Sequence, residues 1–372
     1  MLKRSLQRLS FWALPALAFL LVAPAAQAQD EVGEFIRAGK EDATKLVKAY
    51  AEPAGIALGH NLSSGWFNSG QAMKPGRFDI RIYASAVFAP DNAKTFDISK
   101  LGLKQIRTST GATFDPNRPV LVPTVFGEDT EGPELTVYTR NPLTNQEEEV
   151  VSFNSPPGTG YDVLPFPMAQ VSVGLVKDTE IAVRFVPKTK ADDFEGSLWG
   201  VGVKHGIKQW IPGLASIPGF DVTVFGGYTS LTSSYGLDVP LTADNMQYAT
   251  PQQQSSTYYD GQALELKTKA WSASLIASKT FSVITGYAGV RYSNVETDLN
   301  AVGKYPVVAY RTTVPYSKYV DDVVNPIIVN MKDAQVGATA GLRLKLAFFS
   351  LYGEYTLAKY STAMAGIGLG WN

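Results

Sequence analysis

The chain has no cysteine and only two histidines, His60 and His205, in 372 residues. Without cysteine it can form no disulfide scaffold, no zinc–thiolate site and no lipid-modified N-terminal cysteine. The two histidines lie far apart in the sequence, which argues against a histidine metal site. A net charge of −1 gives no reason to expect nucleic acid as a partner. We therefore expect neither a metal nor a cofactor.

The N-terminus has the features of an export signal. Lys3, Arg4 and Arg8 precede an apolar stretch over residues 11–22, and the small-x-small sequence Ala26-Gln27-Ala28 follows it. The stretch is too short, and too interrupted by prolines, to span a membrane as a helix. After it, no apolar run approaches the ~18 residues of such a helix. The pattern predicts a signal peptide over residues 1–28, cleaved after Ala28.

What the chain does contain is 18 Tyr, 18 Phe and 33 Gly at nearly neutral hydropathy. Secreted β-sandwiches and outer-membrane barrels both have this composition, so periodicity must separate them. In the last ten residues one strand face carries only apolar side chains and ends in Trp371, and the other carries Gly366, Gly368 and Gly370. This pattern is typical of the closing strand of a transmembrane β-barrel.

Strict alternation of apolar and polar residues recurs along the chain. Residues 77–89 and 335–346 alternate over more than the five or six residues of an average soluble strand and cover the ~9–11 that cross a bilayer. With the closing strand, ten strands are clear. The seven others lie at residues 169–175, 180–186, 197–206, 220–230, 270–277, 281–294 and 349–357. Weaker strand patterns occur in segments 94–107, 134–153 and 305–330, which are either extracellular hairpins or further wall strands. A total of 12 or 14 strands therefore remains open.

Short and long connections alternate, as in outer-membrane barrels. The long ones, at residues 90–164, 187–196, 231–261 and 295–333, are predicted to be extracellular. An even strand number then places both termini in the periplasm. We expect an all-β antiparallel barrel over residues 77–372, preceded by an N-terminal segment over residues 29–76.

That N-terminal segment is predicted to lie in the periplasm or to plug the barrel. Ala43, Leu46, Val47 and Tyr50 have helical spacing, which predicts a short helix over residues 42–51 that ends before Pro53. The inward glycines of the closing strand favour a plug, because side-chain-free positions let another backbone approach; alternatively they relieve wall curvature. The predicted constriction consists of His60, Trp66, Phe67 and Asn68.

Several charged residues occupy lumen-facing positions, and they are Arg77, Asp79, Arg81, Arg343, Lys345 and Glu354. Mixed charges inside a barrel pair with one another or with a plug more often than they select ions. We interpret them as a network that holds the N-terminal segment. The alternative is a lining that selects solutes.

Four segments carry a family resemblance: residues 65–70, 165–174, 184–187 and 199–212. They resemble a family of uncharacterised Gram-negative (Bacteroidota-type) outer-membrane β-barrel proteins, loosely similar to the FadL-type transporters of fatty acids and other hydrophobic compounds. The resemblance implies a plugged barrel and a hydrophobic substrate. FadL-type hatches carry an Asn-Pro-Ala element, which residues 30–76 lack.

The leading functional hypothesis is passive, ligand-gated uptake of small hydrophobic molecules by a monomer in outer-membrane lipid, without ATP. The alternative is a non-transporting structural barrel, or a surface-interaction barrel whose loops 90–164 and 231–261 bind a partner. A closed lumen would favour the second, and a gap in the wall the first. An enzyme is not expected, although His60 lies near Ser63 and Ser64. Two features have two interpretations each. The acidic pairs at residues 192–193 and 321–322 either bind calcium or are solvated surface charges. The loop tyrosines either line a ligand-binding mouth or belong to the aromatic girdle.

Overall fold

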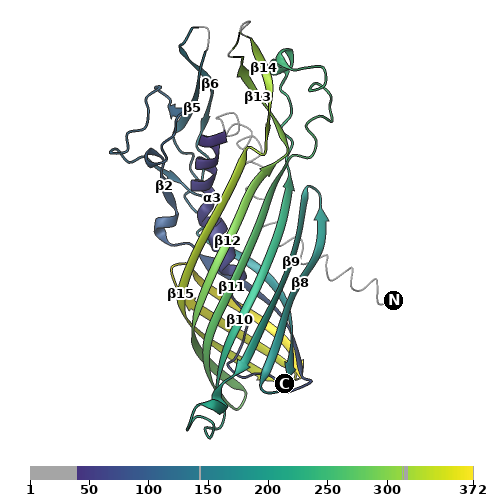
Figure 1. Ribbon diagram of the computed structural model, residues 1–372. Helices are drawn as coiled ribbons and strands as arrows, with labels where there is room; N and C mark the ends of the chain where they lie inside the picture. The colour runs from purple at the N-terminus through teal and green to yellow at the C-terminus, as the bar shows by residue number, and fades with distance from the viewer. Residues whose placement is uncertain (1–39, 142–143, 312, 314–316, 372) are drawn as a thin grey trace.

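The computed structural model describes residues 40–141, 144–311, 313 and 317–371. The predicted signal peptide and residues 29–39 lie outside the described residues. Ten antiparallel strands close a barrel in the order β1-β17-β16-β15-β12-β11-β10-β9-β8-β7 (Figure 1). The predicted all-β barrel and its ten strands are therefore confirmed. The barrel strands are β1 (Phe78–Phe88), β7 (Val163–Leu175), β8 (Thr179–Ala191), β9 (Phe194–Gly206), β10 (Phe220–Gly236), β11 (Ala263–Phe281), β12 (Ile284–Val302), β15 (Ile327–Leu346), β16 (Phe349–Leu357) and β17 (Ser361–Trp371).

The weaker strand patterns form small sheets outside the wall, so the described barrel has neither 12 nor 14 strands. One sheet pairs β2 (Thr95–Asp97) with β4 (Leu121–Pro123), and another pairs β13 (Lys304–Tyr310) with β14 (Lys318–Val324). A third contains β3 (Ile106–Thr108), β5 (Glu134–Arg140) and β6 (Glu147–Asn154). None of these strands has the ~9–11 residues that cross a bilayer. Short 3₁₀ turns lie at Asp91–Ala93, Ile98–Lys100, Lys208–Trp210 and Ala243–Tyr248.

One predicted long loop is wrong, because residues 187–196 belong to the β8–β9 hairpin. Its turn lies at Asp192 and Asp193, and Asp192 has a φ of 52°. The outward side chains here include Lys188 and Glu195, which form an ion pair of 2.6 Å. The strands continue above the membrane with a polar outer face, and a sequence pattern defined by apolar alternation does not detect such an extension.

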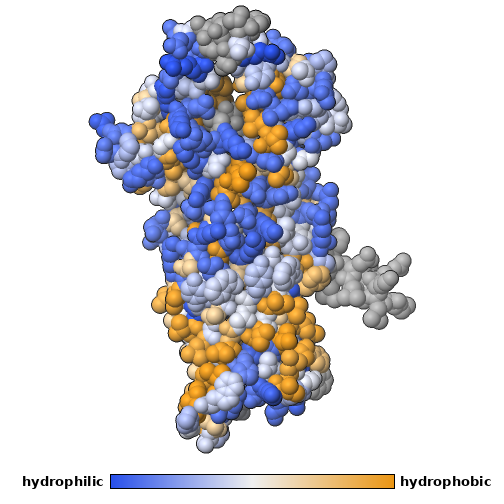
Figure 2. Space-filling view, viewed as in Figure 1, coloured by the Kyte–Doolittle hydropathy of each residue, from blue (hydrophilic) through white to orange (hydrophobic). Residues whose placement is uncertain are grey.

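The outer surface shows where the membrane lies. On β12 the exposed face is apolar from Ile284 to Tyr292 and then becomes polar at Glu296 and Asp298. The aromatic rings of Trp199 and Tyr228 (5.3 Å) and of Trp271 and Tyr292 (5.1 Å) mark this upper boundary on neighbouring strands. Figure 2 shows an apolar band across the lower part of the visible face and a largely hydrophilic surface above it. Such a band with flanking aromatic residues is characteristic of outer-membrane barrels.

Helix α3 (Lys40–Leu62) descends from the loop region into the barrel (Figure 1). The predicted end at Pro53 is wrong, because the helix continues through this proline. A proline inside a helix costs about 3 kcal/mol in isolation, but here the surroundings offset that cost. The N–H of Val125, in a loop, donates to the carbonyl of Tyr50, and residues 55–62 are buried on all sides. Neither α3 nor any other described helix combines the length and apolar character that a membrane-crossing helix needs.

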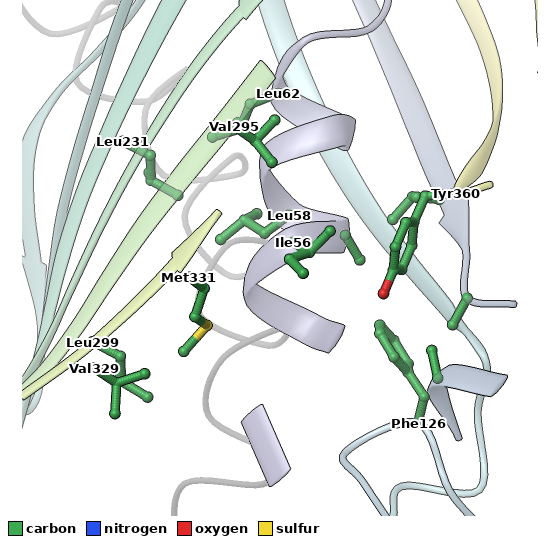
Figure 3. Packing of buried hydrophobic residues seen from close by; sticks show 14 of the residues in the cluster. Ile56, Leu58, Leu62, Phe126, Leu231, Val295, Leu299, Val329, Met331 and Tyr360 are labelled. Carbon is green, nitrogen blue, oxygen red and sulfur yellow. The ribbon is translucent and has the colours of Figure 1, made fainter. Parts of the chain in front are cut away.

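The main apolar core lies between α3 and the inner wall. Figure 3 shows Ile56, Leu58 and Leu62 of α3 beside side chains of the wall and loops, labelled Leu231, Val295, Leu299, Val329, Met331, Tyr360 and Phe126. A Cβ on Gly59 would lie 2.5 Å from Val295. Glycine is therefore required there for the helix to approach β12 this closely. The helix thus fills the upper lumen as a plug.

Candidate functional site

Below α3, the chain crosses the lumen and places Trp66 against two glycines of the wall, Gly202 of β9 and Gly227 of β10, which we call the glycine floor. Ideal Cβ atoms on Gly202 and Gly227 would each come within 2.9 Å of the indole. The indole also meets Phe225 at a centroid distance of 5.5 Å. Trp66 is only 2% exposed, so solvent does not reach around it. The barrel is therefore filled at this level by an indole that fits a side-chain-free part of the wall.

Two buried arginines of the wall bind the plug backbone. Arg184 donates to the carbonyls of Leu62 (2.8 Å) and Ser64 (2.6 Å). Its guanidinium also lies 3.5 Å from the centre of a Trp66 ring. Arg81 donates to the carbonyl of Trp66 at 2.9 Å. The last carbonyls of a helix have no partner within the helix, and these guanidinium groups supply charge-assisted hydrogen bonds at the end of α3.

Arg184 was not among the predicted lumen residues, although alternation along β8 places it inside, between the outward Val183 and Phe185. Glu180, Lys204 and Arg291 were not predicted as members of the network either. Lys204 and Glu180 form a buried pair of 2.8 Å, and Glu180 also accepts from the N–H of Met73 at 3.2 Å. Here too a wall residue contacts the plug backbone. Alternation would have identified these residues as inward-facing.

The predicted lumen residues fall into two groups. In the first, Asp79 lies 3.3 Å from Arg81, and Glu354 pairs with Arg291 at 2.5 Å and accepts from Tyr287. These residues lie in the polar network around the plug. In the second, Arg77, Arg343 and Lys345 border a cavity at the periplasmic end. Arg343 also donates to Asn68 at 3.3 Å, which is a long hydrogen bond.

The double substitution of Arg81 and Arg343 by leucine is expected to loosen the plug and raise conductance in planar bilayers. It removes the bond from Arg81 to the Trp66 carbonyl and the bond from Arg343 to Asn68. Each charge-assisted bond contributes about 1.5–3 kcal/mol. Unchanged conductance in the double variant would count against a plug-holding network.

Among the predicted constriction residues, Phe67 and Asn68 follow Trp66 in the lower lumen. The Phe67 ring meets Phe225 and Tyr287 edge-on at 5.7 and 6.1 Å. The Asn68 amide accepts from Arg343, but its own nitrogen has no hydrogen-bond partner among the described residues. Trp66, Phe67 and Asn68 therefore lie together, whereas His60 lies higher, in the last turn of α3.

The glycines predicted to face the plug have wall atoms as their nearest neighbours. A Cβ on Gly366 would meet Tyr83 at 2.4 Å, and one on Gly368 would meet Ser350 at 2.6 Å. A Cβ on Gly370 would lie 2.7 Å from the carbonyl of Phe78. These glycines make room for side chains and backbone of β1 and β16. The glycines that do admit the plug lie on β9 and β10, beneath Trp66.

His60 forms a buried hydrogen-bonded chain with two wall residues. One ring nitrogen lies 3.0 Å from the Ser293 hydroxyl, and the other lies 2.9 Å from the Asp333 carboxylate. A Ser–His–Asp chain of this kind can activate a serine. The adjoining cavity measures about 10 Å³, which is the space of one water molecule. The hydrogen-bonded chain ties the last turn of α3 to β12 and β15.

The loop tyrosines connect loops to one another. Tyr258 and Tyr259 donate to the two oxygens of Asp322 at 2.6 and 3.0 Å, and Gln253 donates at 2.9 Å. This clasp joins the loop over residues 237–262 to β14. Tyr310 likewise donates to Glu148 at 2.8 Å. Across the parts of the chain that the structure describes, no three His, Asp or Glu side chains form a metal-binding group.

The clasp is expected to open in acid. Burial alone would raise the pKa of the Asp322 carboxyl, but hydrogen bonds from Tyr258, Gln253 and Tyr259 lower it below the usual 3.8. Because the folded pKa lies below the unfolded one, the clasp stabilises the loop above about pH 4 and is lost as the pH falls through the folded pKa.

Hydrogen exchange of residues 237–262 should therefore rise on acidification, and Asp322→Asn should raise it at neutral pH. Asp321→Asn, on the exposed neighbour, is the matched control. Equal exchange in both variants at neutral pH would show that the clasp does not hold the loop.

The barrel wall is incompletely paired between β7 and β8. These strands pair only from Gln170 and Arg184 down to Leu175 and Thr179. Above that level, β7 still pairs with β1 up to Val163, and β8 pairs with β9 up to Ala191, with a bulge between Val186 and Thr189. Residues 163–169 and 185–191 thus form the two edges of an unpaired section of the wall, which we call the wall opening.

Prolines stand on both edges of the wall opening. The N–H of Ala89 donates to Asp162 and that of Gly174 to Arg77, so even-numbered residues of β7 bond to β1. The odd-numbered Pro165 and Pro167 therefore direct their nitrogens, which carry no hydrogen, toward β8. Pro187 lies in the β8 bulge on the facing edge. Proline in a sheet is confined to such edges and bulges, which explains why the pairing ends here.

The solved structures that the chain resembles are outer-membrane β-barrels. Ail of Yersinia pestis has 8% identity and a TM-score of 0.25, over 80% of this chain and 99% of that one. The translocator domain of the autotransporter NalP from Neisseria meningitidis has 8% identity and a TM-score of 0.25, over 86% and 93%. The toluene transporter TbuX of Ralstonia pickettii has 10% identity and a TM-score of 0.19, over 80% and 88%. At these values the likeness concerns the barrel architecture alone.

No curated protein matches the chain in sequence. A family model, described as a family of unknown function, matches residues 6–371. It therefore covers all ten strands, the plug and the wall opening. The chain belongs to this family, DUF6588.

Proposed function

We propose that this protein is a monomeric outer-membrane channel for the passive uptake of small hydrophobic molecules, exported by its signal peptide and working without ATP or a cofactor. The single observation that carries the proposal is the wall opening. A sheet that closes around a lumen normally pairs its backbone groups throughout. An unpaired section bordered by prolines is therefore a built feature of the wall.

The wall opening lies at a level that suits an apolar solute. Phe185 and its partner Trp199 are exposed at the top of the apolar band, and the exposed Lys188 follows above. An apolar molecule in the outer leaflet would meet the opening at the interface. Within the barrel, the nearby wall residues Phe166, Met168 and Leu198 belong to the same apolar cluster as the end of α3, and Leu164 and Val186 pack against this cluster. Entry would thus keep the solute out of water.

Passage toward the periplasm requires the plug to move, because Trp66 and the arginines fill the lumen below. A solute that packs against Leu62 would compete with the contacts that hold the end of α3. Its binding would then favour a displaced plug by the difference in its affinity for the two states. This mechanism is ligand-gated and passive.

The proposal can be tested by replacing the three prolines at the edges of the wall opening with residues that carry a backbone N–H. In the triple variant Pro165→Val, Pro167→Val and Pro187→Val, both edges can pair and the wall opening should close. Uptake of radiolabelled naphthalene by proteoliposomes should then fall to the level of liposomes without protein. Pro306→Val, in the β13–β14 hairpin, is the matched control and should transport normally. Unchanged uptake in a folded triple variant would exclude the wall opening as the entry.

The competing function is a non-transporting surface barrel, and the filled lumen favours it. The loops also form a folded lobe: Asp42 of α3 accepts from the backbone N–H groups of Lys104, Gln105 and Ile106 at 2.7–3.2 Å. A rigid lobe of this kind suits recognition of a partner. Absence of naphthalene uptake by the unmodified protein would favour this function.

We also propose that the protein is not an enzyme. Purified protein is expected to show no hydrolysis of p-nitrophenyl esters above that of the variant Ser293→Ala. The cavity beside Ser293 has space for about one water molecule and none for an ester. Ester hydrolysis that disappears in Ser293→Ala would overturn this expectation.

A further inference from the structure

A cavity of about 310 Å³ lies at the periplasmic end of the barrel. The end of the plug forms one side, with Gln71 and Lys74, and Arg77 stands just before β1. The turn between β11 and β12, the start of β12 with Thr285, and the end of β15 with Arg343 and Lys345 form the other side. Its volume is at the lower end of the range for small-molecule sites.

The charge of the cavity has one sign. Four lining residues are basic and none is acidic. Of the carboxylates near Arg343, Asp79 lies 3.3 Å from Arg81 and Glu180 lies 2.8 Å from Lys204, and Asp221 interacts with Lys208 and Lys204 as well as with Arg343. Within the described chain, no ion pair joins Lys74, Arg77 or Arg343 to a carboxylate. The cavity is thus strongly electropositive.

Arg343 provides a second, independent indication of a ligand. Its side chain is buried, with 7% of the residue exposed. Its two hydrogen bonds, to Asn68 (3.3 Å) and Thr285 (3.4 Å), are long, and its Nε has no acceptor among the described residues. A buried charge without a partner is costly, and in proteins it is normally paired. A planar guanidinium with free donors is the group that binds carboxylate and phosphate best.

We propose that this cavity binds an oxyanion, the phosphate or carboxylate of a small molecule at the periplasmic face. Arg343 binds it from within the barrel, and Lys74 and Arg77 from the plug side. The anion would join the end of the plug to β15. This site lies at the opposite end of the barrel from the wall opening and does not depend on the apolar pathway.

Isothermal titration calorimetry of the full-length protein in a nonionic detergent at low salt tests the proposal. The probes are inorganic phosphate, succinate and the short-chain lipid dihexanoylphosphatidylglycerol. We expect saturable binding of at least one probe, weakened about tenfold or more by Arg343→Gln, because a charge-assisted hydrogen bond is lost. Lys177→Gln, which removes an exposed charge from the β7–β8 turn at the same end, should bind as the unmodified protein does.

The probes also separate the sources of the anion. Binding of the lipid alone identifies a headgroup as ligand, and binding of phosphate or succinate identifies a free solute. If Arg343→Gln fails to fold, judged by its migration in gels before and after heating, Arg77→Gln replaces it with the same expected weakening. The proposal is overturned if no probe binds saturably, or if the folded variant binds as tightly as the unmodified protein.

Discussion

Arg184→Met is expected to release residues 62–70 from the wall and to convert a closed barrel into a conducting one. The substitution removes the donors to the carbonyls of Leu62 and Ser64 and the cation that stacks on Trp66. Removing one partner from a buried charged contact typically costs about 3–5 kcal/mol. Methionine conserves much of the volume, so the effect reports the lost hydrogen bonds. Planar-bilayer recordings should show current steps that the unmodified protein lacks.

The matched control for this prediction is Arg118→Met, whose side chain is 88% exposed in a loop. It should leave both conductance and hydrogen exchange unchanged. The amides of residues 62–70 should exchange faster in Arg184→Met alone. Equal exchange in the two variants would mean that Arg184 does not hold the plug.

Trp66→Ala is expected to produce the second large effect. The indole fills the space above Gly202 and Gly227 and packs on Phe225. Truncating a buried aromatic residue typically costs about 3–5 kcal/mol, part of it for the cavity that remains. The variant should both conduct ions and unfold at a lower temperature, measured by the shift from folded to unfolded migration in gels.

Trp210→Ala provides the comparison for Trp66→Ala. Trp210 is 66% exposed, and it packs beside His205 at the periplasmic edge, with ring centres 5.1 Å apart. Its loss removes an interfacial contact but opens no space in the lumen. If Trp210→Ala lowered the unfolding temperature as much as Trp66→Ala, the packing of Trp66 on the glycine floor would not be what holds the plug in place.

The wall could be predicted from the sequence because a membrane imposes a strict period. Along β1 the side chains from Phe78 to Ala86 alternate between lipid and lumen as their polarity indicates, and only the apolar Val87 departs from the pattern by facing inward. The predictions that were wrong concern segments that lie outside the membrane span, where no such period is imposed. The upper ends of β8 and β9 are polar on the outside, and the continuation of α3 past Pro53 depends on the wall around it. Neither is visible in a local pattern.

The site was only partly predictable, for a similar reason. Parity placed Arg81, Arg343 and Glu354 in the lumen, and they are there. It could not give their partners, because partners depend on strand register and on the path of the plug. The pairing of Arg291 with Glu354 joins β12 to β16, two strands that are not neighbours in the sheet. The wall opening could not be located for the same reason: Pro165, Pro167 and Pro187 are visible in the sequence, but only the strand register shows that they stand on facing edges of β7 and β8.

The filled lumen and the wall opening were expected to point to different functions, yet both occur in this barrel. They are compatible if the solute enters through the wall and the plug governs only the lower half of the path. Arg184 then occupies the decisive place, because it forms the last pair below the wall opening and also holds the plug. One residue would couple entry to release.

Mass spectrometry of organic extracts tests this account most directly. The unmodified protein and the triple proline variant would be purified side by side in mild detergent. The account predicts a discrete apolar compound that is enriched with the unmodified protein and absent from the variant. Extracts that contain only bulk lipid in both samples would contradict it and favour the surface-interaction barrel.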